Sequence, residues 1–106
     1  GRHWEDLVPY NLEQLRQHLE SQFTSEMNWD NYGSYWEVDH IIPQNTFNFT
    51  DYTDVDFQIC WSLLNLRPLT IAENRSRPKD GSDIDDETRS RIIECYDAGI
   101  ENKGGN

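Results

Sequence analysis

The residues best suited to chemistry lie side by side in the stretch WEVDHIIPQNTF, residues 36–47. Asp39 is followed directly by His40 at the end of a short β-like run, and Pro43 comes soon after. Histidine has an unperturbed pKa of ~6.5 and takes up a proton near neutral pH, so His40 is a candidate general base. Hard divalent cations such as Mg²⁺ prefer oxygen ligands, so Asp39 is a candidate metal ligand.

Two asparagines further along the chain fit the same chemistry. Asn65 precedes the run LRPL, and Asn74 lies in TIAENRSR, where its amide oxygen would complement the carboxylate of Asp39. Phosphodiester hydrolysis needs such parts, because a base must activate water and a cation must neutralise charge on the phosphate. Singly, each residue also has an ordinary explanation, as a surface ion pair, a turn residue or an exposed helix residue. Their occurrence together and in this order favours a nuclease site.

The blocks WEVDHIIPQNTF and CWSLLNLRPLTIAEN resemble the HNH endonucleases, also called the ββα-metal or His-Me finger family. The similarity covers about residues 9–80 and is greatest to small phage-type HNH proteins, which share a helix and an MNWDNYG-like lead-in. The HNH domains of RNA-guided nucleases have a similar VDHI-P start. The resemblance implies an α+β fold with a ββα-metal core, in which a two-stranded antiparallel hairpin is flanked by an N-terminal and a C-terminal helix.

The resemblance also implies a role for each motif residue. His40 would be the general base, and Asn65 would hold the loop that orients it by bonding to backbone. Asp39 and Asn74 would bind one divalent cation. The third motif position holds asparagine rather than the name-giving histidine, so the chain resembles an HNN variant. Mg²⁺ or Mn²⁺ is therefore the expected cofactor, and members with a four-cysteine zinc staple have no counterpart in this sequence.

Hydrophobic spacing and capping residues predict the individual elements. We expect helices over 11–23, with Asn11 as cap, and over 54–64. A third helix starts from the capping-box pattern of Thr70 and ends at Pro78, and a fourth runs from Asp83 to Gly99. Strands are expected over 35–41 and 66–69. The whole is one domain over residues 1–106, divided into a helical lead-in (about 9–32), a core (about 33–80), a C-terminal helix (about 83–98) and a flexible tail (99–106).

The charge distribution is uneven. The chain carries a net charge of −11, which by itself argues against a nucleic-acid partner. Four of its nine cations nevertheless fall within thirteen residues around the predicted metal-binding helix, namely Arg67, Arg75, Arg77 and Lys79. These are either a solvated basic face or, as we expect beside a phosphodiester site, contacts to DNA backbone phosphates that do not read sequence.

Several other residues have more than one explanation, and the sequence leaves these open. Glu37 shares the strand face of Asp39 and either supports the site, adds a metal ligand or is simply an exposed acid. His3 and His18 are weak candidates for chemistry. Two free thiols are favoured over a single bridge between the two cysteines, Cys60 and Cys95, and the absence of a CxxC pair argues against a structural zinc. The tryptophans at 29, 36 and 61 are expected in the core.

The leading hypothesis is a metal-dependent DNA endonuclease that nicks one strand and leaves 5′-phosphate and 3′-hydroxyl ends. The alternatives are a catalytically silent HNH-fold module that binds DNA or protein, and an accessory nuclease active only within a phage packaging, repair or restriction assembly. A protein partner or further domain would then supply specificity. We expect a monomer or weak dimer that is soluble and intracellular, in the host cytoplasm if phage-encoded, because no apolar run reaches the ~20 residues that cross a bilayer.

Overall fold

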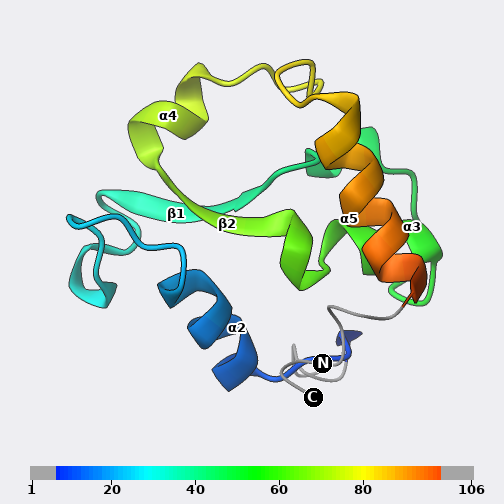
Figure 1. The fold of residues 1–106 in the computed structure, drawn as a ribbon, viewed down its shortest axis with the longest axis horizontal. Coiled ribbons are helices and arrows are strands. Elements are labelled where there is room, and N and C mark those ends of the chain that lie inside the picture. The colour runs from blue at the N-terminus through cyan, green and yellow to red at the C-terminus, as the bar shows by residue number, and fades with distance from the viewer. Residues whose placement is uncertain (1–6, 99–106) are drawn as a thin grey trace.

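The computed structural model describes residues 7–98, so the predicted tail, the predicted stop at Gly99 and His3 lie outside the described part. The fold is α+β, with a two-stranded antiparallel sheet and helices around it (Figure 1). Its regular elements are, in chain order, α2 (Leu12–Glu20), β1 (Trp36–His40), α3 (Val55–Cys60), β2 (Leu66–Thr70), α4 (Ile71–Ser76) and α5 (Asp86–Ala98). None of the helices in this part of the chain is long and apolar enough to cross a membrane.

The sheet brings the two halves of the motif together. β1 and β2 pair along their whole length, with Asp39 opposite Arg67 and His40 opposite Leu66. β2 runs directly into α4, which turns back along β1. Side chains of α4 and the residue after it therefore reach the end of β1, although more than 30 residues separate them along the chain.

Two helix starts are fixed by the side chains that the sequence predicted. The side chain of Asn11 accepts a hydrogen bond from the Gln14 backbone N–H, and the Gln14 side-chain oxygen accepts one from the Asn11 backbone N–H. Thr70 and Glu73 form the same reciprocal pair at the start of α4. Such capping boxes satisfy backbone N–H groups that have no partner within the helix. Both predicted caps are confirmed.

Three predicted helices are shorter than expected. α2 ends at Glu20, and α3 ends at Cys60, where Ser62 adopts an extended backbone and Asn65 donates to the Cys60 carbonyl. α5 begins at Asp86 because the side chain of Asp85 accepts the Thr88 amide and acts as the cap. In each case a side chain or backbone group satisfies the helix end earlier than the hydrophobic spacing indicated.

The described part of the chain has two hydrophobic clusters. Val8, Tyr10, Leu63 and Leu66 form one of them. Ile42, Ile59 and Ile92 form the other, which joins the connection after β1 to α3 and α5 (Figure 1). The segments on both sides of His40 are thereby fixed by apolar contacts.

The tryptophans divide between core and surface. Trp36 is fully buried, contacts the rings of Phe23 and Trp29, and donates from Nε1 to the Asn28 carbonyl at 2.7 Å. Trp29 is 40% exposed, which corrects the prediction that it lies in the core. Its indole N–H is held at the surface by the Glu20 carboxylate, 2.6 Å away.

Cys60 and Cys95 are both free thiols. Burial, with a smaller effect of the Asp56 charge, raises the pKa of Cys60 to about 12. The thiolate is the reactive and metal-binding form of cysteine, so Cys60 is a packing residue.

We predict that Trp36→Phe lowers the free energy of unfolding by about 1–3 kcal/mol, because it leaves the Asn28 carbonyl unsatisfied and opens space at the start of β1. Urea denaturation measures the change. Val55→Ala, at a side chain that is 57% exposed, is the control and should stay within about 0.5 kcal/mol of the parent. Equal losses for the two variants would contradict the anchoring role of Trp36.

Candidate active site

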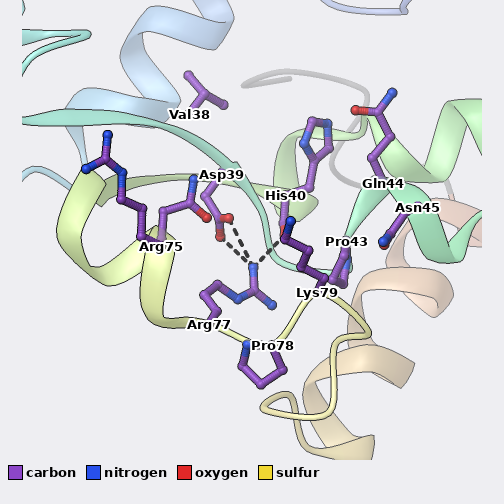
Figure 2. A pocket seen from close by; sticks show the side chains of 11 residues that line it. Val38, Asp39, His40, Pro43, Gln44, Asn45, Arg75, Arg77, Pro78 and Lys79 are labelled. Carbon is purple, nitrogen blue, oxygen red and sulfur yellow. Dashed lines mark hydrogen bonds and ion pairs between the residues drawn. The ribbon is translucent and has the colours of Figure 1, made fainter.

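A pocket of about 560 Å³ opens where the end of β1 meets α4 (Figure 2). Its walls come from two short segments, residues 38–45 and 74–79. Six of the predicted site residues line it together with two further residues of the motif, namely Asp39, His40, Asn74, Arg75, Arg77 and Lys79 with Gln44 and Asn45. Two segments distant in sequence thus share one concave surface, which is the usual form of a small-molecule or active site.

The imidazole of His40 is half-buried at this pocket. Among the described residues its Nε2 is the buried side-chain polar atom that has no hydrogen-bond partner. The ring lies perpendicular to that of Trp61, with ring centroids 4.2 Å apart. Burial lowers the pKa of His40 below its ordinary value, although the charge of Asp39 acts in the opposite direction. A lowered pKa keeps the imidazole neutral, as a general base must be.

Asn65 fixes the chain directly after His40. It is completely buried, and its side-chain oxygen accepts the Ile42 amide at 2.7 Å. Its side-chain nitrogen donates to the carbonyls of Ile42 at 3.2 Å and Cys60 at 2.8 Å. The Asn65 backbone carbonyl also accepts the Ile41 amide at 2.8 Å. The hydrogen bonds described for the Asn65 side chain all go to backbone groups, and Asn65 does not line the pocket. Asn65 therefore acts on His40 by fixing the backbone that follows it.

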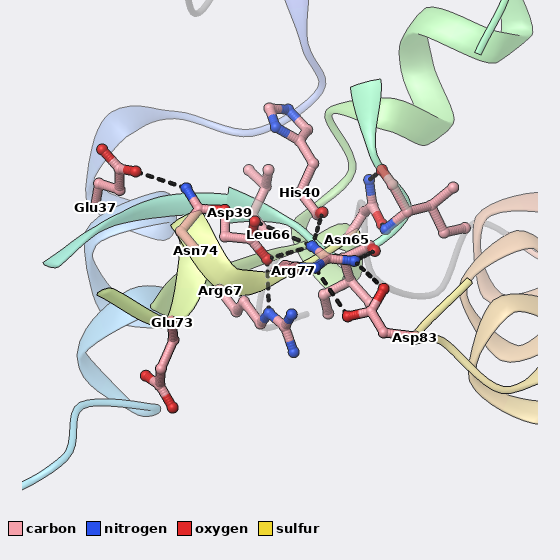
Figure 3. A network of polar contacts seen from close by, with 12 residues as sticks. Glu37, Asp39, His40, Asn65, Leu66, Arg67, Glu73, Asn74, Arg77 and Asp83 are labelled. Carbon is pink, nitrogen blue, oxygen red and sulfur yellow. Dashed lines mark hydrogen bonds and ion pairs between the residues drawn. The ribbon is translucent and has the colours of Figure 1, made fainter. Parts of the chain in front are cut away.

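Asp39 is buried and is held by two arginines (Figure 3). Its Oδ2 accepts from Arg67 Nε and from Arg77 Nη1, each at 2.8 Å, whereas within residues 7–98 its Oδ1 accepts from Arg77 Nη1 alone, at 3.1 Å. An ionised carboxylate has about four lone-pair sites. One position on Oδ1 therefore remains for another donor or a cation.

Glu37 determines which way the Asn74 amide points. The amide nitrogen of Asn74 donates to Glu37 Oε1 at 2.6 Å (Figure 3). Because an ionised carboxylate only accepts hydrogen bonds, the nitrogen must face Glu37 and the amide oxygen must face elsewhere. Within residues 7–98 the Asn74 side-chain oxygen has no recorded hydrogen-bond partner, and Asn74 lines the pocket.

The residues around Asp39 fit a cation that retains water. Among residues 7–98 no three His, Cys, Asp or Glu side chains gather into a metal-binding group. The pocket offers one carboxylate oxygen of Asp39 and one amide oxygen of Asn74. Mg²⁺ is commonly held by one or two protein oxygens plus waters and substrate phosphates, and this donor set matches that pattern better than a structural zinc site.

The structure divides the four expected phosphate contacts into two pairs. Arg75 and Lys79 are exposed and line the pocket. Arg67 lies outside the pocket lining and binds Asp39. Arg77 departs furthest from the expectation, because its side chain is only 7% exposed and its guanidinium is used within the protein.

Arg77 joins three parts of the chain. Besides Asp39, its guanidinium donates to the carbonyls of His40 and Ile41, each at 2.8 Å, and to both oxygens of Asp83. The hydrogen bond from Arg77 lowers the pKa of Asp83 below its ordinary value. A guanidinium engaged in this way is a structural group that fixes the end of β1, which corrects the expectation of a phosphate contact.

Three contributors to the site were not identified from the sequence. Gln44 and Asn45 line the pocket, and their place directly after Pro43 in the motif was the available signal. Trp61 contacts His40, but an aromatic residue in an apolar run gives no sign of such a contact. His18, a weak candidate in the sequence, instead contacts the Leu66 carbonyl through Nε2 at 2.8 Å and supports β2.

Comparisons with known proteins give two viral relatives. The chain is 42% identical over 60 residues to the uncharacterized protein L426 of Acanthamoeba polyphaga mimivirus, which is 57% of this chain and 26% of that protein. It is 37% identical over 79 residues to the uncharacterized protein L246 of the same virus, which is 74% of this chain and 34% of that protein. The chain thus spans about a quarter to a third of each relative. No family model and no solved structure matches it.

We predict that Arg77→Met lowers the free energy of unfolding by about 3 kcal/mol, because it leaves a buried carboxylate short of a partner and two carbonyls unsatisfied. Arg75→Met changes an exposed residue two positions earlier, in α4, and should stay within about 0.5 kcal/mol. Urea denaturation of both variants at neutral pH makes the comparison. Similar stability for the two would show that Arg77 is not the structural group described above.

Proposed function

We propose that this chain is a divalent-metal-dependent DNA endonuclease of the ββα-metal (HNH) type, in its HNN form. The observation that carries the proposal is the shared pocket, in which Asp39 and His40 from the end of β1 meet Asn74 from α4. Two exposed cations, Arg75 and Lys79, stand at the same pocket, where a phosphodiester would need them. The order of strand, strand and helix in this part of the chain agrees with the resemblance found in the sequence.

In this proposal His40 removes a proton from the attacking water. The oxygen of that water would then bond to phosphorus as the bond from phosphorus to the 3′ oxygen breaks. The leaving 3′ oxygen would take a proton from solvent water, which gives 5′-phosphate and 3′-hydroxyl ends. Burial keeps His40 neutral and ready to accept the proton. Asn65 holds the backbone that follows it, so the imidazole is not free to move with the long connection.

The proposed cation would be held by the free Oδ1 position of Asp39 and by the amide oxygen of Asn74, which Glu37 turns away from itself. When bound, Mg²⁺ or Mn²⁺ supplies neutralisation of the charge that develops on the phosphate and on the leaving oxygen. Arg67 and Arg77 already offset part of the Asp39 charge, and they hold the carboxylate in place before a cation arrives.

The second candidate is a binding module without catalysis. Two features favour it, namely the engagement of Asp39 by two arginines and the net charge of −11. The two arginines weaken the attraction of Asp39 for a cation, and the negative net charge weakens the attraction of the chain for DNA. The small share of each viral relative that the chain covers also fits an accessory nuclease, whose remaining parts would bring the substrate to the pocket.

We predict that the full chain relaxes supercoiled plasmid in Mg²⁺ or Mn²⁺ and that EDTA stops the reaction. His40→Ala should lower the nicking rate by about 10²–10⁴, the usual effect of losing a general base. Agarose gels of plasmid over time measure the rate. His18→Gln, at a histidine that binds the Leu66 carbonyl outside the pocket, is the matched control and should nick like the parent.

If His40→Ala, purified free of other nucleases, nicks at the parental rate, His40 is not the general base. Binding of DNA without cleavage in several divalent cations would instead select the binding module.

A separate prediction concerns the exposed cations. In a His40→Ala background, Arg75→Ala combined with Lys79→Ala should make the dependence of log affinity on log salt shallower by about 2, since each phosphate contact contributes about 0.9. Fluorescence anisotropy with a short duplex at several salt concentrations measures this slope. Arg91→Ala, at an exposed cation of α5 outside the pocket lining, should leave the slope unchanged. A change of equal size in the control would assign the attraction to overall charge rather than to the pocket.

A further inference from the structure

The imidazole of His40 has two nitrogens in different surroundings. Nε2 is buried and lacks a hydrogen-bond partner among the described residues. His40 as a whole nevertheless lines the pocket and is only partly buried. A buried polar atom without a partner is costly, and its position therefore needs a physical reason.

Trp61 provides that reason. Its ring meets the imidazole at 84° with centroids 4.2 Å apart, which is an edge-to-face arrangement. The face of an aromatic ring carries negative charge and can accept an N–H group. Trp61 itself is well anchored, because it caps α3, its amide bonds to the Phe57 carbonyl, and its own carbonyl accepts Tyr10 Oη at 2.6 Å.

We propose that Trp61 is a positioning residue for the general base: its indole face receives the Nε2–H edge of His40, so that unprotonated Nδ1 is presented to the pocket. A neutral imidazole has one N–H and one free lone pair. If the proton lies on Nε2 against the indole, the lone pair must lie on Nδ1. This inference rests on the proposed function, since only a hydrolytic site uses that lone pair to take a proton from water.

The other groups around His40 agree with this assignment. Arg77 binds the His40 carbonyl and the Asp39 carboxylate and is engaged there. Asn65 binds backbone. These bonds use the backbone of His40 and groups of its neighbours. Within residues 7–98, the side-chain contact described for the imidazole ring is the one with Trp61.

The test uses the ¹⁵N-labelled full chain without metal or DNA, at a pH well above ~6.5, the ordinary pKa of histidine. Long-range ¹H–¹⁵N correlation spectra report which ring nitrogen carries the proton, and His40→Asn assigns the signals. We expect the Nε2–H form, with ring protons of His40 shifted upfield by the indole. Trp61→Leu should abolish that shift and lower kcat for nicking about fivefold with little change in KM. Trp61→Phe retains an aromatic face and should restore both.

A proton on Nδ1 in the parent, or unchanged His40 signals in Trp61→Leu, would overturn the assignment. Should Trp61→Leu fail to fold, the parent tautomer and the Trp61→Phe spectrum still decide the question. Because the spectra need neither metal nor cleavage, the expected tautomer in a protein that never nicks would refute the proposed function and leave only the contact of the Nε2–H edge with Trp61 standing.

Discussion

The buried amide of Asn65 holds together the two ends of the long connection between the strands. A two-stranded sheet is marginally stable by itself, and the end of β1 therefore needs support from outside the sheet. Asn65 provides it by bonding to the backbone of Ile42 on one side and to the last carbonyl of α3 on the other. All three of these bonds are buried, where an unsatisfied group is most costly. The position of His40, two residues before Ile42, follows from this one side chain.

Arg77 supplies a second constraint that acts from the opposite direction. It connects the end of α4 to the end of β1 and to Asp83, which leads into α5. The C-terminal helix is thereby coupled to the pocket without contributing a side chain to its lining. Arg77 and Arg67 together place two positive groups on Asp39. The charge of the pocket is therefore set by these ion pairs as much as by its exposed cations.

The sequence predicted the local features of this fold well, because they depend on neighbouring residues. The caps at Asn11 and Thr70, the two strands and the break at Pro78 all follow from short-range rules and agree with the structure. The early end of α3 was not predictable in this way, because it depends on Asn65, which lies five residues beyond Cys60 and folds back to it.

Side-chain environment was harder to predict than secondary structure. Arg75 and Arg77 look alike in a cluster of cations, and Arg77 is buried because Asp39, Asp83 and two backbone carbonyls surround its guanidinium in space. Trp29 and Trp36 likewise differ because Glu20 holds one indole at the surface. The contact of Trp61 with His40 joins two elements across the sheet connection, and no local pattern encodes it.

The lining of the pocket comes from two short runs of chain, residues 38–45 and 74–79, joined by one pair of strands. A site of this kind is compact in the gene as well as in space. Recombination can transfer it between larger proteins as one uninterrupted cassette, and the helices around it can diverge as long as they continue to cover the hydrophobic clusters. The two mimivirus relatives are both much longer than the region that they share with this chain.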